Sequence, residues 1–173
     1  EACLGISGNQ LYRLSERIYK LTWSLNLNEK ERSVENMAKI ILVSHGGLSK
    51  GMKDSVSMIV GDLAKDIETY SLLPGQNPED FYQEVLKEAK ESEEQFLILC
   101  DIKGGSVHTA LSKLAVLDNV MVFSGMNMGL ALDVVMKSLG QNLELADAND
   151  LIEAAKEGMT VMNGMTSEDD EDF

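Results

Sequence analysis

The chain has 173 residues, enough for one domain with a substantial core, and its apolar fraction of 44% and charged fraction of 25% are ordinary for a globular protein. Its 29 acidic and 15 basic residues give a formal net charge of −14, which repels nucleic acid and anionic lipid and excludes both as expected partners. No apolar run is long enough to span a membrane and the first residues lack the pattern of a secretory signal, so we expect a cytoplasmic protein.

Three segments are expected along the chain. Residues 1–36 form an N-terminal extension that carries equal numbers of basic and acidic residues, and its apolar residues between 11 and 25 recur at helical spacing. Two interpretations of it stay open: a docked helix, or upstream sequence translated ahead of a natural start at Met37. Residues 37–164 are expected to form the folded domain, and residues 165–173 an acidic, solvated tail.

Short apolar runs alternate with segments of helical spacing from Met37 onward. In chain order the pattern predicts a strand at 39–44, a helix at 48–63, a strand at 67–70, a helix at 78–93, a strand at 96–100, a helix at 107–117, a strand at 120–124 and a helix at 127–139. A last helix has most of its length at 150–157, and a short final strand is predicted at 159–162. Parallel neighbours need crossover connections, so this alternation predicts an α/β fold: an open, mostly parallel sheet with helices on both faces.

Polar loops follow the first and third predicted strands. His45 comes directly after the strand at 39–44, and Asp101 directly after the strand at 96–100. Ligands of open parallel sheets bind beyond the carboxyl ends of the strands, so the two side chains can meet if these strands are neighbours. A carboxylate on one ring nitrogen fixes the tautomer of an imidazole and leaves the second nitrogen as a nucleophile toward phosphorus. The pair is therefore a candidate catalytic site.

Glycine and serine surround this pair. The glycine after His45 allows close backbone approach, and the Gly-Gly-Ser loop at a helix start offers amides, a hydroxyl and a positive dipole end to a phosphoryl oxygen. The candidate phosphate-binding residues are Gly46, Gly104, Gly105 and Ser106. The common nucleotide motifs GxxxxGK[ST] and GxGxxG are absent. Because histidines after strands and Gly-Gly pairs are most often structural, spacing alone indicates a cleft without naming its reaction.

Three segments resemble the mannose-family IIA component of the sugar phosphotransferase system. They are ILVSHGGLSKGM at residues 41–52, LILCDIKGGS at residues 97–106, and SGMNMGL at residues 124–130. Their order and intervals agree with that family from Met37 to about Gly164, and the first two motifs together are fairly specific. The match covers the whole predicted folded domain.

This resemblance implies a phosphocarrier. His45 would take a phosphoryl group from phospho-HPr and pass it to a IIB component, with the membrane IIC and IID components engaged indirectly for sugar uptake. Asp101 would orient the imidazole, and Ser106 would contact the phosphate. A homodimer is also implied, in which a four-stranded parallel sheet is completed by an antiparallel strand at 159–162 exchanged between subunits. No metal or cofactor is expected, because a phosphoramidate is already an activated donor.

The chain departs from the family pattern beside the second loop. The family often has proline after Gly-Gly-Ser, where this chain has Val107-His108-Thr109, and Ile102-Lys103 replaces more usual polar or aromatic neighbours. These differences leave the sugar and the details of partner recognition open. We interpret His108 as structural, although its nearness to the site leaves a supporting role open. Cys100, which lies in no CxxC motif, is interpreted as a small buried apolar residue.

Two alternatives stay open. The phosphocarrier subunit of dihydroxyacetone kinase resembles the same fold and also uses a histidine, although the loop from Asp101 to Ser106 is more similar to the sugar transporter type. The other alternative is a non-catalytic regulatory module of flavodoxin-like shape, which would bind a ligand without transferring phosphate.

Overall fold

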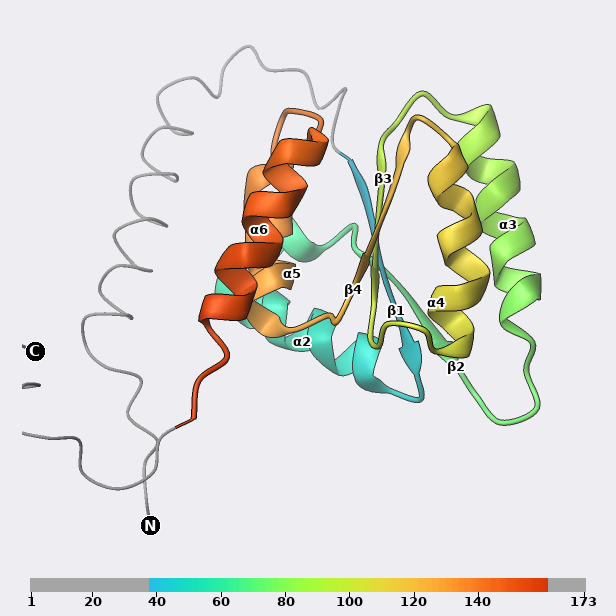
Figure 1. Ribbon diagram of the computed structural model, residues 1–173, viewed down its shortest axis with the longest axis horizontal. Helices are drawn as coiled ribbons and strands as arrows, with labels where there is room; N and C mark the ends of the chain where they lie inside the picture. The colour runs from blue at the N-terminus through green and yellow to red at the C-terminus, as the bar shows by residue number, and fades with distance from the viewer. Residues whose placement is uncertain (1–37, 162–173) are drawn as a thin grey trace, which may run out of the picture. The chain divides into compact units, whose positions relative to one another are not determined.

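The computed structural model describes residues 38–161. Four strands form one parallel sheet in the order β2-β1-β3-β4 (Figure 1). The strands are β1 (Lys39–His45), β2 (Glu68–Leu72), β3 (Phe96–Cys100) and β4 (Val120–Ser124). The predicted α/β class and parallel sheet are confirmed.

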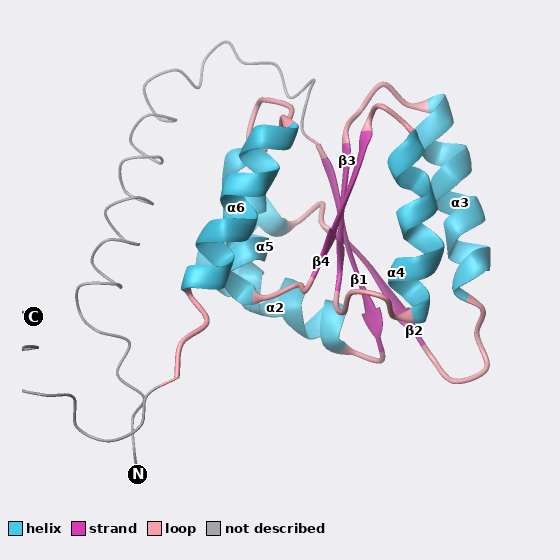
Figure 2. Ribbon diagram, in the orientation of Figure 1, coloured by secondary structure: helices cyan, strands magenta, loops and turns pink. Residues whose placement is uncertain are grey.

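Helices cover both faces of the sheet. Figure 2 shows α2, α5 and α6 on one face and α3 and α4 on the other. Two of these helices continue into short 3₁₀ segments, η1 and η2. The bounds are α2 (Leu48–Val60), η1 (Gly61–Ala64), α3 (Pro78–Glu91), α4 (Ser106–Leu111), η2 (Ser112–Val116), α5 (Met128–Lys137) and α6 (Leu145–Glu157). None of the described helices is long and apolar enough to cross a membrane.

The core has two halves, one on each face of the sheet. Successive side chains of β1 point to opposite faces, so that Ile40 and Leu42 pack in one half while Ile41 and Val43 pack in the other. All five residues of the central strand β3 are buried, including Cys100. Burial on both faces explains why these strands appear in the sequence as continuous apolar runs rather than as alternating patterns.

Several element ends differ from the sequence prediction. Helix α2 stops at Val60 because Gly61 adopts a left-handed φ of 58°, and the chain continues as a 3₁₀ turn. Residues 150–157, expected to make up most of the last helix, form the later part of α6, which begins at Leu145, where Glu144 and Asp147 form a reciprocal capping box. A weak apolar pattern over that first turn concealed the start.

The predicted ends of the domain stay untested. Residues 1–36 and 165–173 lie outside the described residues. Residues 159–161 carry no regular secondary structure, and Met162 is outside the described range. A strand exchanged between subunits forms only against a second chain, so the strand at 159–162 stays a prediction.

Candidate functional site

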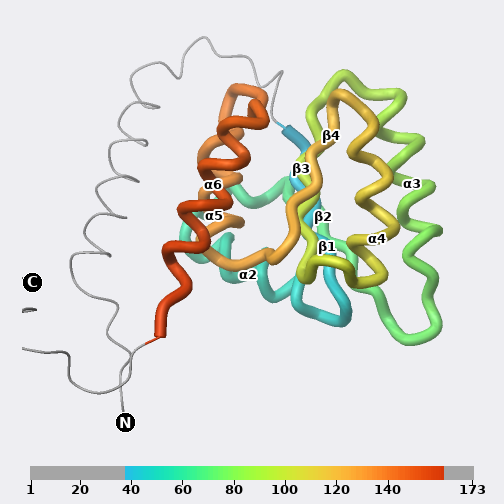
Figure 3. The backbone as a smooth tube through the Cα atoms, in the orientation of Figure 1, coloured from blue at the N-terminus to red at the C-terminus, as the bar shows by residue number. Residues whose placement is uncertain are grey.

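The sheet brings the two predicted loops together. His45 is the last residue of β1, and Asp101 directly follows β3, its parallel neighbour. The N–H of Asp101 donates to the carbonyl of Val43 at 3.1 Å, which extends the pairing beyond the strand. The order of the strands reverses between β1 and β3, the place where open parallel sheets bind ligands. Figure 3 shows the β1–α2 turn and the β3–α4 loop at this same end of the sheet.

Asp101 fixes the imidazole of His45. One carboxylate oxygen, Oδ2, accepts a hydrogen bond from the backbone N–H of His45 at 2.8 Å and another from Nδ1 at 2.9 Å. The other oxygen, Oδ1, accepts from the N–H of Ile102 at 2.8 Å. Because a carboxylate can only accept, the ring proton lies on Nδ1 and the lone pair lies on Nε2.

The carboxyl of Asp101 is charged although it is largely buried. Its side chain is 10% exposed, against 45% for that of His45. Burial acts to raise the pKa of Asp101, but the hydrogen bonds from His45 and Ile102 outweigh it and hold the pKa below its ordinary value of 3.8. The site therefore combines a buried fixed anion with an accessible imidazole.

Ser106 contacts the second ring nitrogen. Its Oγ lies 3.0 Å from Nε2 of His45. Since Nε2 carries the lone pair, the serine hydroxyl donates and the nitrogen accepts. A phosphorus atom that bonded to Nε2 would approach along this same lone pair, so the hydroxyl would first have to turn away from the nitrogen.

Gly105 lies against the imidazole. A Cβ at this position would stand 3.0 Å from Cε1 of His45 and 2.8 Å from Cγ2 of Ile102. Both distances are shorter than an ordinary contact, so a side chain here would displace the ring or the isoleucine.

A match to a known family identifies the kind of protein that carries this site. The model of the PTS system fructose IIA component, EIIA-man, matches residues 39–156, which include both loops of the site. The chain belongs to this family. It is a mannose-family IIA component of a sugar phosphotransferase system, as the motifs around His45 and Asp101 predicted.

Known proteins agree with this assignment. The PTS system sorbose-specific EIIA component of Klebsiella pneumoniae is 31% identical over 101 residues, which cover 57% of this chain and 73% of that protein. The crystal structure of phosphotransferase system component EIIA from Streptococcus agalactiae has a TM-score of 0.64 at 23% identity, covering 72% of this chain and 97% of that one. The mannose/sorbose-specific IIA subunit from Enterococcus faecalis has a TM-score of 0.61 at 24% identity, covering 75% and 98%. The two structures share the fold.

The glycines of this IIA component use their amides within the protein. Gly46 has a φ of 57° and donates its N–H to the carbonyl of Leu72 at 2.9 Å. Gly104 has a φ of 77° and donates its N–H to Nδ1 of His108 at 3.2 Å. Their left-handed conformations explain why glycine is required at both turns. Phosphate binding by Gly46, Gly104, Gly105 and Ser106 stays a prediction.

Sequence reasoning missed two serines that anchor the β1–α2 turn of the IIA component. Ser44 and Ser49 are fully buried. The hydroxyl of Ser44 accepts from the N–H of Ser49 at 2.7 Å and so satisfies an amide at the start of α2, which has no side-chain cap at Gly47. Ser49 in turn donates to the carbonyl of Tyr70 on β2 at 2.8 Å. The sequence signal that could have revealed this anchor is Ser44 itself, a polar residue that directly follows the apolar run of β1.

Among the described residues, no group of three or more His, Cys, Asp and Glu side chains is arranged to hold a metal ion.

Cys100 is buried behind the site, where burial and the neighbouring Asp101 charge raise the pKa of its thiol to about 12. A thiol that stays protonated at neutral pH is a poor nucleophile, so Cys100 behaves as the small apolar residue that the sequence predicted.

Gly105→Ala is expected to slow phosphoryl uptake by roughly tenfold, because the added methyl group moves the imidazole that the carboxylate holds. Rates of phosphoryl transfer from phospho-HPr to the two proteins measure this. Gly47→Ala is a matched control, since a Cβ there meets no atom within 4 Å and should leave the rate within about twofold. Equal rates for Gly105→Ala and the wild type would contradict the close packing.

Proposed function

We propose that this IIA component is a phosphohistidine carrier. His45 accepts a phosphoryl group on Nε2 from phospho-HPr and transfers it to a IIB component, which supports sugar uptake through the membrane IIC and IID components. The observation that carries the proposal is the double hydrogen bond from His45 to Oδ2 of Asp101, which leaves the lone pair of an accessible ring on Nε2. The proposal places the protein in the cytoplasm.

The transfer needs few chemical groups. The lone pair of Nε2 attacks phosphorus while the phosphorus–nitrogen bond of the donor breaks, and the electron pair of that bond returns to the donor ring. The Nδ1 proton of His45 stays hydrogen-bonded to Asp101, so the charged carboxylate offsets the positive charge that develops on the ring. The reverse sequence passes the group to IIB. Positioning and electrostatic support are the main contributions of the protein, because the donor is already activated.

The surroundings of His45 suit a protein partner. Three apolar side chains beside the site are exposed: Leu48 at 49%, Leu73 at 50% and Ile102 at 58%. Apolar groups at the centre of a protein–protein contact exclude water from it. Exclusion of water protects a phosphoryl group from hydrolysis during its transfer. The segments at 46–53 and 102–109, each a loop with the start of the helix that follows it, contain lysines and no acidic residue, although the chain as a whole has a net charge of −14. Both features favour docking of a phosphorylated protein.

A homodimer is part of the proposal. Among residues 38–161, strand β4 is at the edge of the sheet and pairs with β3 alone, so one side of its backbone is open to another strand. A groove along this edge is lined by β4 residues and by Leu145, Ala148 and Ile152 of α6. We place residues 159–162 of a second subunit in this groove as an antiparallel strand. Sedimentation analysis should then give twice the mass of the 19.0 kDa chain.

The test is labelling of the wild-type protein with phosphoenolpyruvate, enzyme I and HPr. We expect one acid-labile, alkali-stable phosphoryl group per chain, on the peptide that contains His45, and loss of that group when a cognate IIB is added. Transfer to a dihydroxyacetone kinase instead of IIB would favour the kinase subunit. Absence of label under conditions that phosphorylate HPr would overturn the proposal and favour a binding module without phosphotransfer.

A further inference from the structure

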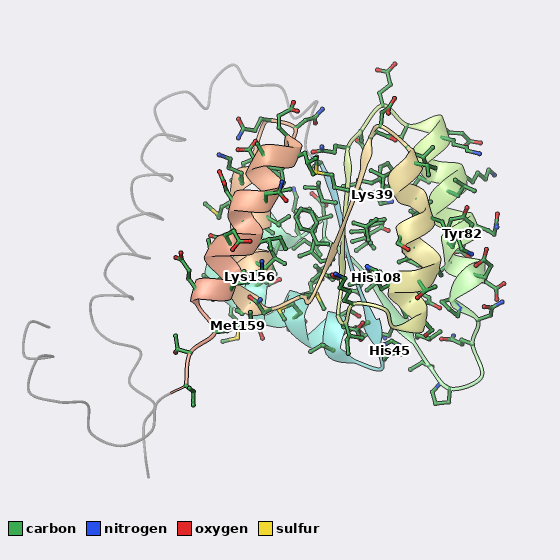
Figure 4. All side chains as sticks on the ribbon, viewed as in Figure 1. Lys39, His45, Tyr82, His108, Lys156 and Met159 are labelled. Carbon is green, nitrogen blue, oxygen red and sulfur yellow. The ribbon has the colours of Figure 1, made fainter. Side chains whose placement is uncertain are left out.

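His108 contacts the loop that carries Gly105 and Ser106. It lies in the first turn of α4, and its Nδ1 accepts the N–H of Gly104 at 3.2 Å. In Figure 4 both His45 and His108 lie toward the end of the sheet where β1 ends and α4 begins. The family resemblance assigns no function to His108, which lies two residues after Ser106.

The contact holds a left-handed turn of the loop at Gly104. Gly104 is in the left-handed region, with a φ of 77°, and side chains bond both its N–H and its carbonyl. While His108 accepts from its N–H, the hydroxyl of Thr109 approaches its carbonyl at 3.4 Å, a long and weak hydrogen bond. Two backbone bonds complete the turn: the N–H of Gly105 donates to Ile102 and that of Thr109 to Gly105. Of the two side chains that bond Gly104, His108 therefore provides the stronger restraint.

This restraint acts next to the reacting nitrogen. Gly105 follows Gly104 directly and packs against Cε1 of His45, and Ser106 places its hydroxyl 3.0 Å from Nε2. A rotation of the Gly104 peptide would move both residues, because they are the next two along the chain. Gly104 is exposed, so water can replace a lost partner for its N–H. His108 is therefore not needed to satisfy the Gly104 N–H, and its side chain instead fixes the orientation of that N–H.

We propose that His108 is a positioning residue for phosphoryl transfer, which holds Gly105 and Ser106 against the imidazole of His45 through its Nδ1 acceptor. This inference rests on the proposed phosphocarrier function. It requires the proton of His108 to lie on Nε2, the opposite tautomer to that of His45, whose proton lies on Nδ1. The chain thus uses its two histidines in complementary states.

Two isosteric substitutions separate this role from a general structural one. In His108→Asn, the amide oxygen can take the place of Nδ1, whereas in His108→Gln the polar end lies where Nε2 was. We expect His108→Asn to transfer phosphate within about twofold of wild type and His108→Gln to be slower by roughly five- to tenfold. The loss should appear in kcat with KM for phospho-HPr unchanged, because the docking surface is intact. Equal rates for the two variants, whether fast or slow, overturn the proposal.

A spectroscopic measurement distinguishes this proposal from the proposed function. Nitrogen-15 spectra of the wild-type side chains should show the Nε2–H tautomer for His108, and hydrogen exchange of the Gly104 amide should be at least about fivefold faster in His108→Gln than in His108→Asn. An Nδ1–H tautomer would overturn the inference. If the tautomer and exchange are as expected but the wild type takes no phosphoryl group, the phosphocarrier function fails instead.

Discussion

Replacing His45 with glutamine is expected to abolish phosphoryl uptake from phospho-HPr, by more than about 10³-fold. A glutamine amide occupies the region of Nε2 but has no nucleophilic lone pair on nitrogen. The fold should persist, because the side chain of His45 is 45% exposed and the backbone N–H that binds Asp101 is unchanged. Acid-labile phosphate per chain measures the loss, and thermal unfolding checks the fold.

The second histidine provides the matched control. The chain contains two histidines, so His108→Asn removes the other candidate acceptor while retaining the loop contact. This variant should still be labelled. His45→Gln keeps the exposed side chains of Leu48 and Ile102, and an excess of it should therefore compete with wild type for phospho-HPr. Label that persists in His45→Gln and maps to His108 would sink the assignment.

Much of the fold could be predicted because the strands are buried on both faces. The five residues of β3 and the apolar centre of β1 are continuous runs with no polar alternation, which is typical of a parallel sheet. Less could be predicted at helix ends. The start of α6 depends on a capping box between Glu144 and Asp147. The first turn of this helix has no strong apolar pattern that would mark its start in the sequence. The proposed exchange of the last strand depends on the position of a second subunit, and local patterns in the sequence do not predict that position.

The candidate site was predictable as a pair of residues but not as a geometry. Position after two strands indicated that His45 and Asp101 could meet, and the sheet order makes those strands neighbours. Which ring nitrogen faces the carboxylate depends on Oδ2 reaching both the backbone N–H and Nδ1, a contact over 56 positions of sequence. The contact of Gly104 with His108 was missed for another reason: histidine is a common structural residue, and its role here depends on one nitrogen.

Asp101→Asn is expected to slow phosphoryl transfer by roughly 10²- to 10⁴-fold. If the amide oxygen replaces Oδ2, the amide group faces the N–H of Ile102 and two donors oppose each other. In the flipped orientation the amide donates to His45, which drives the ring proton to Nε2 and removes the nucleophilic lone pair. Either orientation also removes the charge that offsets the phosphorylated ring. Transfer rates from phospho-HPr measure the effect, and Asp150→Asn on the exposed side of α6 is the matched control.

The same substitution should change how stability depends on pH. The pKa of Asp101 is held below its ordinary value by its hydrogen bonds to His45 and Ile102, so the charged carboxylate stabilises the folded state above the unfolded-state pKa of about 3.9. This contribution is lost as pH falls through the folded-state pKa. In urea unfolding, wild type should therefore exceed Asp101→Asn in free energy of unfolding near neutral pH, and the difference should shrink below about pH 4. A difference independent of pH, or an unchanged transfer rate, would mean that something other than this carboxylate orients the imidazole.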